Sequence, residues 1–135
     1  MGQQQLLLLV IGIVLVGIAV LAGLEAVQQH VRHDEADGLL DRGLSIATHA
    51  VAWKTRNDPF NGGNQSYEGL GTNGLQVLAL DSTTIRGSFG ITDATVNTVE
   101  ITGISDRYPE VGIRVYLSGY AIDSSAVRFD GSLSL

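Results

Sequence analysis

Residues 6–24 are the feature that most limits what this chain can fold into. The stretch reads LLLLVIGIVLVGIAVLAGL and contains no charge, no proline and no side chain more polar than alanine or glycine. As an α-helix it would extend about 28 Å, close to the thickness of the hydrocarbon core of a bilayer. A helix on the surface of a small globular domain is apolar on one face only. The stretch therefore predicts a helix that lies in lipid, among other copies of itself, or first in one and then in the other.

The residues before this stretch argue against a cleaved secretory signal. They read Met-Gly-Gln-Gln-Gln and carry no lysine or arginine, whereas a secretory signal begins with a positively charged region. We therefore expect residues 1–24 to be retained as a membrane or filament-core helix. The residues expected to make contacts between such helices are Leu6, Leu9, Ile13, Val16, Gly17, Val20, Gly23 and Leu24.

Glycines interrupt the apolar stretch at positions 12, 17 and 23. Each costs an isolated helix up to ~1 kcal/mol relative to alanine. In a helix bundle, small side chains let backbones approach closely, but glycine is also frequent in membrane helices in general. The sequence leaves both explanations open.

The helical pattern continues through residues 25–56, where it becomes amphipathic. Apolar residues recur at the i, i+4, i+7, i+11 spacing of one helix face. The pattern weakens in residues 33–38, which predicts a kink, fraying or a polar contact there. The first proline is Pro59, and the position before a proline disfavours helix, so the helix should end near residue 56. The face expected to pack on a sheet consists of Leu40, Leu44, Ala47 and Val51.

The remaining residues predict a loop followed by a β domain. Residues 57–74 hold five glycines and four asparagines and are expected to form the loop. Within residues 75–135, short segments alternate apolar and polar side chains, which is typical of half-buried strands; residues 75–80, apolar on both faces, are a candidate central strand. The result is an α+β fold, in which the second half of a long N-terminal α-helix packs on a C-terminal antiparallel β-sheet. The expected strands lie at 75–80, 85–91, 98–102, 111–117 and 127–129.

Composition excludes several classes of function. The net charge of −6 and the lack of a basic cluster exclude a nucleic-acid partner held through phosphates. The chain has no cysteine, which excludes disulfides and thiolate chemistry. No motif brings a nucleophile and a base together, so we expect no enzymatic activity and no cofactor.

The sequence contains three sets of polar residues that are candidate sites. His30 and His33 are three residues apart with acidic residues nearby, but a solvated helix segment or a contact between subunits is favoured over a metal site. His49, beside the apolar face, is expected to be packed or hydrogen-bonded in the core. Asn64-Gln65-Ser66 is a sequon for N-linked glycosylation, a short triplet that also arises by chance, and it marks Asn64 as the candidate modification site.

The order of these segments resembles the type IV pilin and pseudopilin superfamily. The resemblance lies in the Met1-Gly2 stub, the apolar run and the single amphipathic helix, which together cover positions 1 to about 55; over the β domain it is one of architecture only. Some family features are absent. The family's glutamate, five residues after the cleaved glycine, is Leu7 here, and the helix-breaking proline and the C-terminal disulfide are missing.

The resemblance implies a structural function and a location. It implies the subunit of an extracellular, pilus-like filament, which is a head-to-tail homopolymer whose core is a bundle of N-terminal helices. The subunit would wait in the cytoplasmic membrane and be added to a cell-surface filament by an assembly machinery. The alternatives are a single-pass, N-terminally anchored surface binding module and a low-copy accessory pseudopilin.

Overall fold

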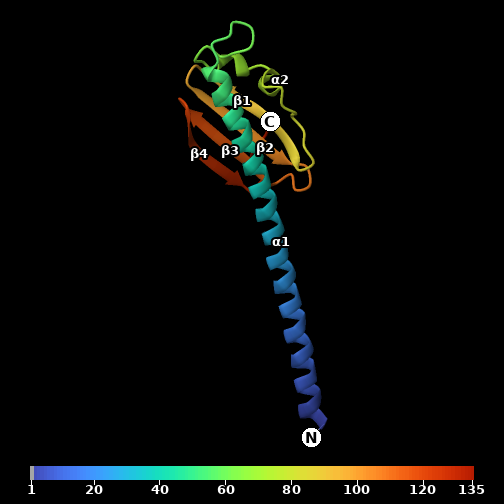
Figure 1. The fold of residues 1–135 in the computed structure, drawn as a ribbon. Coiled ribbons are helices and arrows are strands. Elements are labelled where there is room, and N and C mark those ends of the chain that lie inside the picture. Colours follow the sequence, from blue (N-terminus) through green and yellow to red (C-terminus); the bar gives the residue numbers. More distant parts are fainter. Residues whose placement is uncertain (1) are drawn as a thin grey trace. The chain divides into compact units, whose positions relative to one another are not determined.

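The computed structural model describes residues 2–135; Met1, the first residue of the Met1-Gly2 stub, lies outside them. The described chain contains one long helix, two short helical turns and one antiparallel sheet, so the expected α+β fold is confirmed (Figure 1). It divides into two compact units, with the division between His33 and Asp34. The elements are α1 (Gly2–Thr55), the 3₁₀ turn η1 (Glu68–Leu70), α2 (Gly74–Val77), β1 (Gly87–Ala94), β2 (Thr98–Ser105), β3 (Gly112–Ser118) and β4 (Ala121–Arg128).

Helix α1 ends at Thr55, one residue before the expected boundary. The following loop supplies donors to the carbonyl groups that a helix end leaves unpaired. The backbone N–H of Gly63 donates to the carbonyl of Trp53 (2.9 Å) and that of Gln65 donates to the carbonyl of Lys54 (2.8 Å). The glycine- and asparagine-rich loop is therefore a cap for α1.

The sheet is an antiparallel meander with the strand order β1-β2-β3-β4. The alternation expected in the second and third strands is confirmed, because Val99 and Ile101 of β2 pair with Leu117 and Val115 of β3 and all four are buried. Strands β3 and β4 are joined by a tight turn at Gly119, whose φ of 65° suits glycine. Strand β4 begins earlier than the expected segment at 127–129 and carries one extra residue, Asp123, between the pairs Leu117–Ile122 and Tyr116–Ser124.

The expected strand at residues 75–80 is wrong. This run begins within α2 and continues as a turn, and α2 packs on β1, where a Cβ atom added at Gly74 would lie 2.5 Å from Cδ1 of Ile91. A short run that is apolar on both faces fits a buried helical turn as well as a strand. Ile85, expected in the next strand, is fully exposed and precedes β1.

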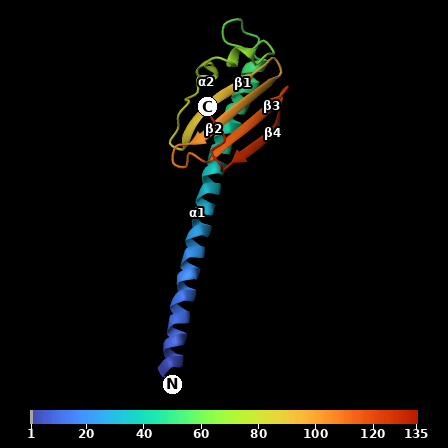
Figure 2. The same cartoon turned by 180° about the vertical axis from the view of Figure 1, so that it is seen from behind.

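Within the second unit, residues 34–55 of α1 cover one face of the sheet; from behind, the strands lie in front of the helix (Figures 1 and 2). A close contact lies at Gly43, where an added Cβ atom would be 2.8 Å from Cδ1 of Ile113 on β3. The buried face differs from the expected one. Ala47 is buried, but the other three predicted residues, Leu40, Leu44 and Val51, are half-buried on the flank of the helix. The centre of the buried face lies roughly a quarter-turn away and consists of Ala36, Leu39, Gly43, Ile46 and Ala50.

The opposite face of the sheet is partly covered by the last residues of the chain. The backbone N–H of Gly131 donates to the carbonyl of Glu110 (3.1 Å). Beyond this bond, Leu133 lies against Gly112 of β3 and Leu135 lies against Gly90 of β1, each close enough that a Cβ atom on the glycine would be within 3.3 Å of the leucine. Two glycines on the outer face therefore make room for two apolar side chains.

Candidate functional site

The most unusual surface of the described chain is the apolar segment of α1, residues 6–24. Every leucine, isoleucine and valine in it is exposed, from 46% for Ile11 to 70% for Leu8. All eight residues predicted to make contacts between helices are among the exposed ones. Monomeric soluble proteins rarely expose apolar patches larger than a few hundred Å², so this segment requires cover from lipid or protein.

The helix that contains this segment is long and apolar enough to cross a membrane. The segment is equally suited to a bundle of identical helices, because lipid tails are as apolar as leucine. Its composition does not distinguish these two environments. Both keep the segment out of water.

The glycines of the segment have free space around them in the isolated chain. Apart from adjacent residues and the nearby backbone of α1 itself, no described atom lies within 4 Å of a Cβ atom added at Gly12, Gly17 or Gly23. A shallow apolar groove beside Gly12 is lined by Leu8, Leu9, Ile13 and Val16. The fold of the single chain therefore gives these glycines no packing role, and larger side chains fit there without a clash.

A polar contact marks the start of the second unit, where the sequence predicted a kink, fraying or a polar contact. The helix continues through residues 33–38, and the polar contact is present. Glu35 is almost fully buried; its Oε1 accepts a hydrogen bond from the Ser105 hydroxyl at 3.0 Å. Its Oε2 lies 3.6 Å from an Arg86 guanidinium nitrogen, and this guanidinium rests on Gly38, where an added Cβ atom would come within 2.6 Å of it. Glu35 thus fastens the first turn of the second unit to the sheet.

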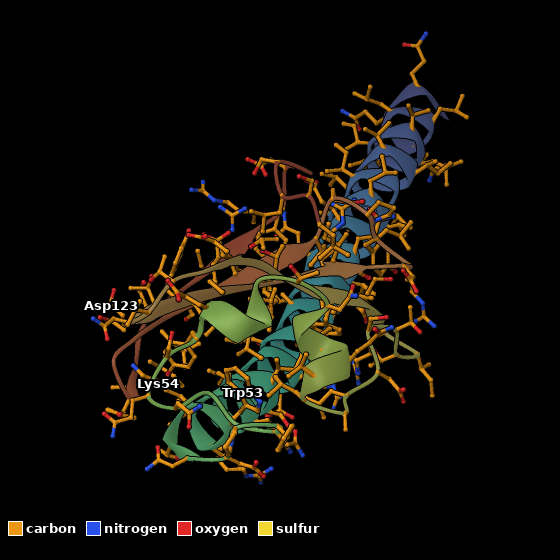
Figure 3. The ribbon with its side chains drawn as sticks, turned by 90° about the horizontal axis from the view of Figure 1, so that it is seen from above. Trp53, Lys54 and Asp123 are labelled. Atoms are coloured by element: carbon orange, nitrogen blue, oxygen red, sulfur yellow. The ribbon has the colours of Figure 1, made fainter. Side chains whose placement is uncertain are left out.

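A second buried cluster, which the sequence did not predict, lies at the C-terminal end of α1. Lys54 is 2% exposed, and its ammonium group lies 4.5 Å from the ring centre of Tyr67 and 4.6 Å from that of Tyr120. It donates a hydrogen bond to the Gly119 carbonyl (3.2 Å). Figure 3 shows Lys54 on the side of α1 toward Asp123, the extra residue of β4, with Trp53 turned to the other side. Aromatic faces attract a cation, and the attraction is stronger away from water.

The neighbouring Tyr67 links the loop to the sheet. Its hydroxyl donates a 2.7 Å hydrogen bond to the same Gly119 carbonyl. Burial raises the pKa of Tyr67 above its usual value, and the nearby Tyr120 adds to the shift. The cluster therefore ties α1, the loop and the β3–β4 turn together as a structural joint. Nothing in the sequence beyond the presence of Tyr67 and Tyr120 indicates this joint, because a lysine is seldom buried.

Trp53 packs against the loop on the other side of α1. A Cβ atom added at Gly63 or Gly69 would come within 2.7 or 2.6 Å of its ring. Two of the five glycines in the predicted loop are thus required for close contact with an aromatic core residue. The sequence predicted a loop for both glycines and no packing role.

The histidines His30, His33 and His49 are the polar candidates on α1. Within residues 2–135, no three His, Cys, Asp or Glu side chains are grouped in a way that could hold a metal ion. His30 and His33 both have interactions with other residues. His49, expected to be packed or hydrogen-bonded in the core, is hydrogen-bonded through Nδ1 to the carbonyl oxygen of Ser45 (2.8 Å), but its side chain is exposed, so its expected place in the core is wrong.

Asn64, the candidate glycosylation residue, is exposed in the capping loop. Its φ is 49°, in the left-handed region, where asparagine is one of the better tolerated residues. Its backbone N–H donates to the Arg56 carbonyl (3.2 Å). The side chain is therefore accessible, while the backbone is held by the helix cap.

Comparisons of the chain with known protein families, with characterised proteins and with solved structures find no match.

Proposed function

We propose that this protein is the repeating subunit of an extracellular, pilus-like filament, with residues 6–24 bundled in the filament core. The observation that supports this proposal is the complete exposure of that segment in a chain whose other residues form a closed core of their own. The segment is not needed to complete the fold of the second unit. Its partner must therefore lie outside the chain.

The free energy of transferring the apolar segment out of lipid limits the environments it can enter. Leaving lipid for water would cost about 20–40 kcal/mol for its fourteen Leu, Ile and Val side chains at ~1.5–3 kcal/mol each. Moving from lipid into a bundle of identical helices costs almost nothing in hydrophobic terms. A subunit can wait in the cytoplasmic membrane and then enter a polymer only by this second path, with an assembly machinery to drive it.

Close packing between helices is the interaction that would stabilise the polymer relative to the subunit in the membrane. Glycines at positions 12, 17 and 23 have no role within the subunit, and small residues permit close approach between helices. No carboxylate in the segment is available to pair with a neighbouring chain's amine. The contacts must be heterologous, from one face to a different face, because a filament does not close on itself.

The proposal is tested with Gly17→Leu and Gly23→Leu in the full chain. Both changes add a large side chain where the subunit has free space, so the second unit should fold normally while filaments disappear. Leu15→Met, which conserves volume and apolarity, is the matched control and should leave filaments intact. Filaments are counted by negative-stain microscopy of sheared surface material and identified by mass spectrometry.

The outcomes distinguish the competing functions. An anchored surface binding module predicts that the unaltered protein stays in the membrane fraction after shearing, and an accessory pseudopilin predicts a few copies per filament. Normal filaments from both glycine variants would contradict close packing at these positions. A protein found only as isolated protomers in detergent or lipid would contradict the filament itself.

A further inference from the structure

One helix is too narrow to cover this four-stranded sheet. A helix with its side chains is about 10–12 Å across, whereas four strands spaced ~4.8 Å apart span more than that. Helix α1 contacts β3 closely at Gly43, and α2 packs on β1 at Gly74. The face of β4 on the helix side is left uncovered: Ile122 and Val127 pair with the buried Leu117 and Ile113 of β3, yet they are 47% and 36% exposed.

An apolar groove results between α1 and β4. Its lining contains no charged side chain, although the chain as a whole is acidic. Leu40 and Leu44 continue the same flank of the helix toward its N-terminus and are only half-buried. The residues that line this α1–β4 groove are Ala47, Thr48, Val51, Ala52, Tyr120 and Ile122.

The size of the groove excludes a stable dimer held by this surface alone. From Leu40 to Val51 the helix rises about 16 Å, and a strip one helix wide along it buries only a few hundred Å² in all. A stable interface buries roughly 1,200–2,000 Å². The occupant must therefore be held by a larger contact elsewhere.

The free edge of β4 is a poor alternative. The extra residue Asp123 interrupts the regular pairing of this strand and places a carboxylate at the edge of the sheet. A bulge and a charge are both devices by which edge strands avoid pairing with another chain. The uncovered surface of β4 is thus its apolar side facing α1, rather than its backbone.

We infer that the α1–β4 groove receives the apolar helix segment, residues 6–24, of a second copy of this chain. The inference rests on the proposed filament and names a second contact of that segment. An uncharged groove in an acidic protein matches an uncharged partner, and residues 6–24 are the other large uncharged apolar surface of the described chain. The small area is sufficient because the bundle of apolar helices supplies the main contact. The proposed filament brings the apolar segment of one copy beside the second unit of another.

The test is disulfide cross-linking between two versions of the full chain, which has no cysteine of its own. Copies with Ile122→Cys are co-expressed with copies that carry a single cysteine at Val10, Val16 or Leu21, and sheared filaments are oxidised with copper–phenanthroline. We expect mixed dimers with at least one of the three positions. Thr48→Cys, on the helix side of the groove, repeats the measurement in case Ile122→Cys does not fold, and Trp53 fluorescence reports folding.

The matched control is Ser124→Cys. Ser124 is close to Ile122 on β4 and exposed, but it pairs with Tyr116, which alternates with the buried Val115 and Leu117 and so lies on the opposite face. It should give at least tenfold less mixed dimer. In the same way, Ile122→Lys should lower the filament yield roughly tenfold or more, because it places an unpaired charge in an apolar contact, while Ser124→Lys should not.

Each failure has its own signature. Filaments that form but give no mixed dimer from either groove cysteine would overturn the inference and leave the filament standing. Dimers formed by Ile122→Cys with itself would show two grooves facing each other and would also overturn it. If the unaltered chain forms no filaments, the proposed function fails, and the inference fails with it.

Discussion

The two parts of α1 have the same backbone and opposite surroundings. Residues 6–24 expose every large apolar side chain, whereas residues 35–54 bury nine residues against the sheet and the capping loop. The first part is uniformly apolar and packs against nothing described, while the second carries small residues where it meets the sheet. The difference shows that hydrophobicity alone does not mark the core of this protein; the core is where small residues allow close contact.

The largest expected effect on stability comes from replacing isoleucine by alanine in the second unit, compared with the same replacement in the apolar segment. Ile101→Ala removes a fully buried side chain from β2 and should lower the free energy of unfolding by about 2–5 kcal/mol. Ile13→Ala, in the exposed segment, should leave that value unchanged. Urea unfolding of the full chain in detergent micelles, followed by the fluorescence of the single Trp53, measures both. An equal loss in the two variants would show that the regions unfold as one.

Leucine in place of glycine provides the next contrast. At Gly43 even a Cβ atom would lie 2.8 Å from Cδ1 of the buried Ile113, so Gly43→Leu should destabilise the second unit by about 1–3 kcal/mol or more. At Gly17 there is free space, and Gly17→Leu should leave the stability of the second unit unchanged while it blocks filaments. The same unfolding experiment applies, and a stable Gly43→Leu variant would contradict the close helix–sheet contact.

The polar contact at the start of the second unit sharpens the boundary between the regions. Glu35→Ala leaves the hydroxyl of the buried Ser105 without its acceptor and Arg86 without its carboxylate, which should cost about 1–3 kcal/mol. Asp37→Ala, two residues further on and exposed, is the control and should change the stability by less than ~0.5 kcal/mol. Chemical denaturation compares them; equal values would mean that Glu35 has no anchoring role.

The smallest effect is a dependence on alkaline pH. Because the pKa of Tyr67 is raised above 10.0 in the folded protein, the folded state holds this proton more tightly than the unfolded state. Its contribution to stability is complete below pH 10 and is lost as the pH rises through the folded-state pKa. Tyr67→Phe should lose about 1 kcal/mol at neutral pH with the hydrogen bond to Gly119 and should show a weaker alkaline loss. Identical pH profiles for the two proteins would refute the assignment.

Some of these elements were accessible from the sequence because they depend on local pattern. Because the first proline is Pro59, the sequence predicted a helix end near residue 56. Helix α1 ends at Thr55. The alternation in residues 111–117 predicted the buried face of β3. The break in the helical pattern at residues 33–38 pointed to the polar contact that Glu35 makes.

Other elements depended on contacts between distant residues. The run at 75–80 was expected to be a strand and instead begins in a helical turn, because a short run that is apolar on both faces is compatible with either conformation. The buried face of α1 was misplaced by about a quarter-turn, because three of the five residues at its centre, Ala36, Gly43 and Ala50, are small and carry little hydrophobic signal. Lys54 was unrecognisable as a core residue until Tyr67 and Tyr120 were placed around it.

The sequence by itself determined that residues 6–24 avoid water and that a separate α+β unit follows, since both depend on composition and on short-range periodicity. Only the tertiary structure decided which face of α1 meets the sheet and which face of β4 remains uncovered. The physical reason is that a side chain's burial depends on the width of the helix relative to the sheet and on the small residues that let them touch, and neither quantity is written in a local pattern.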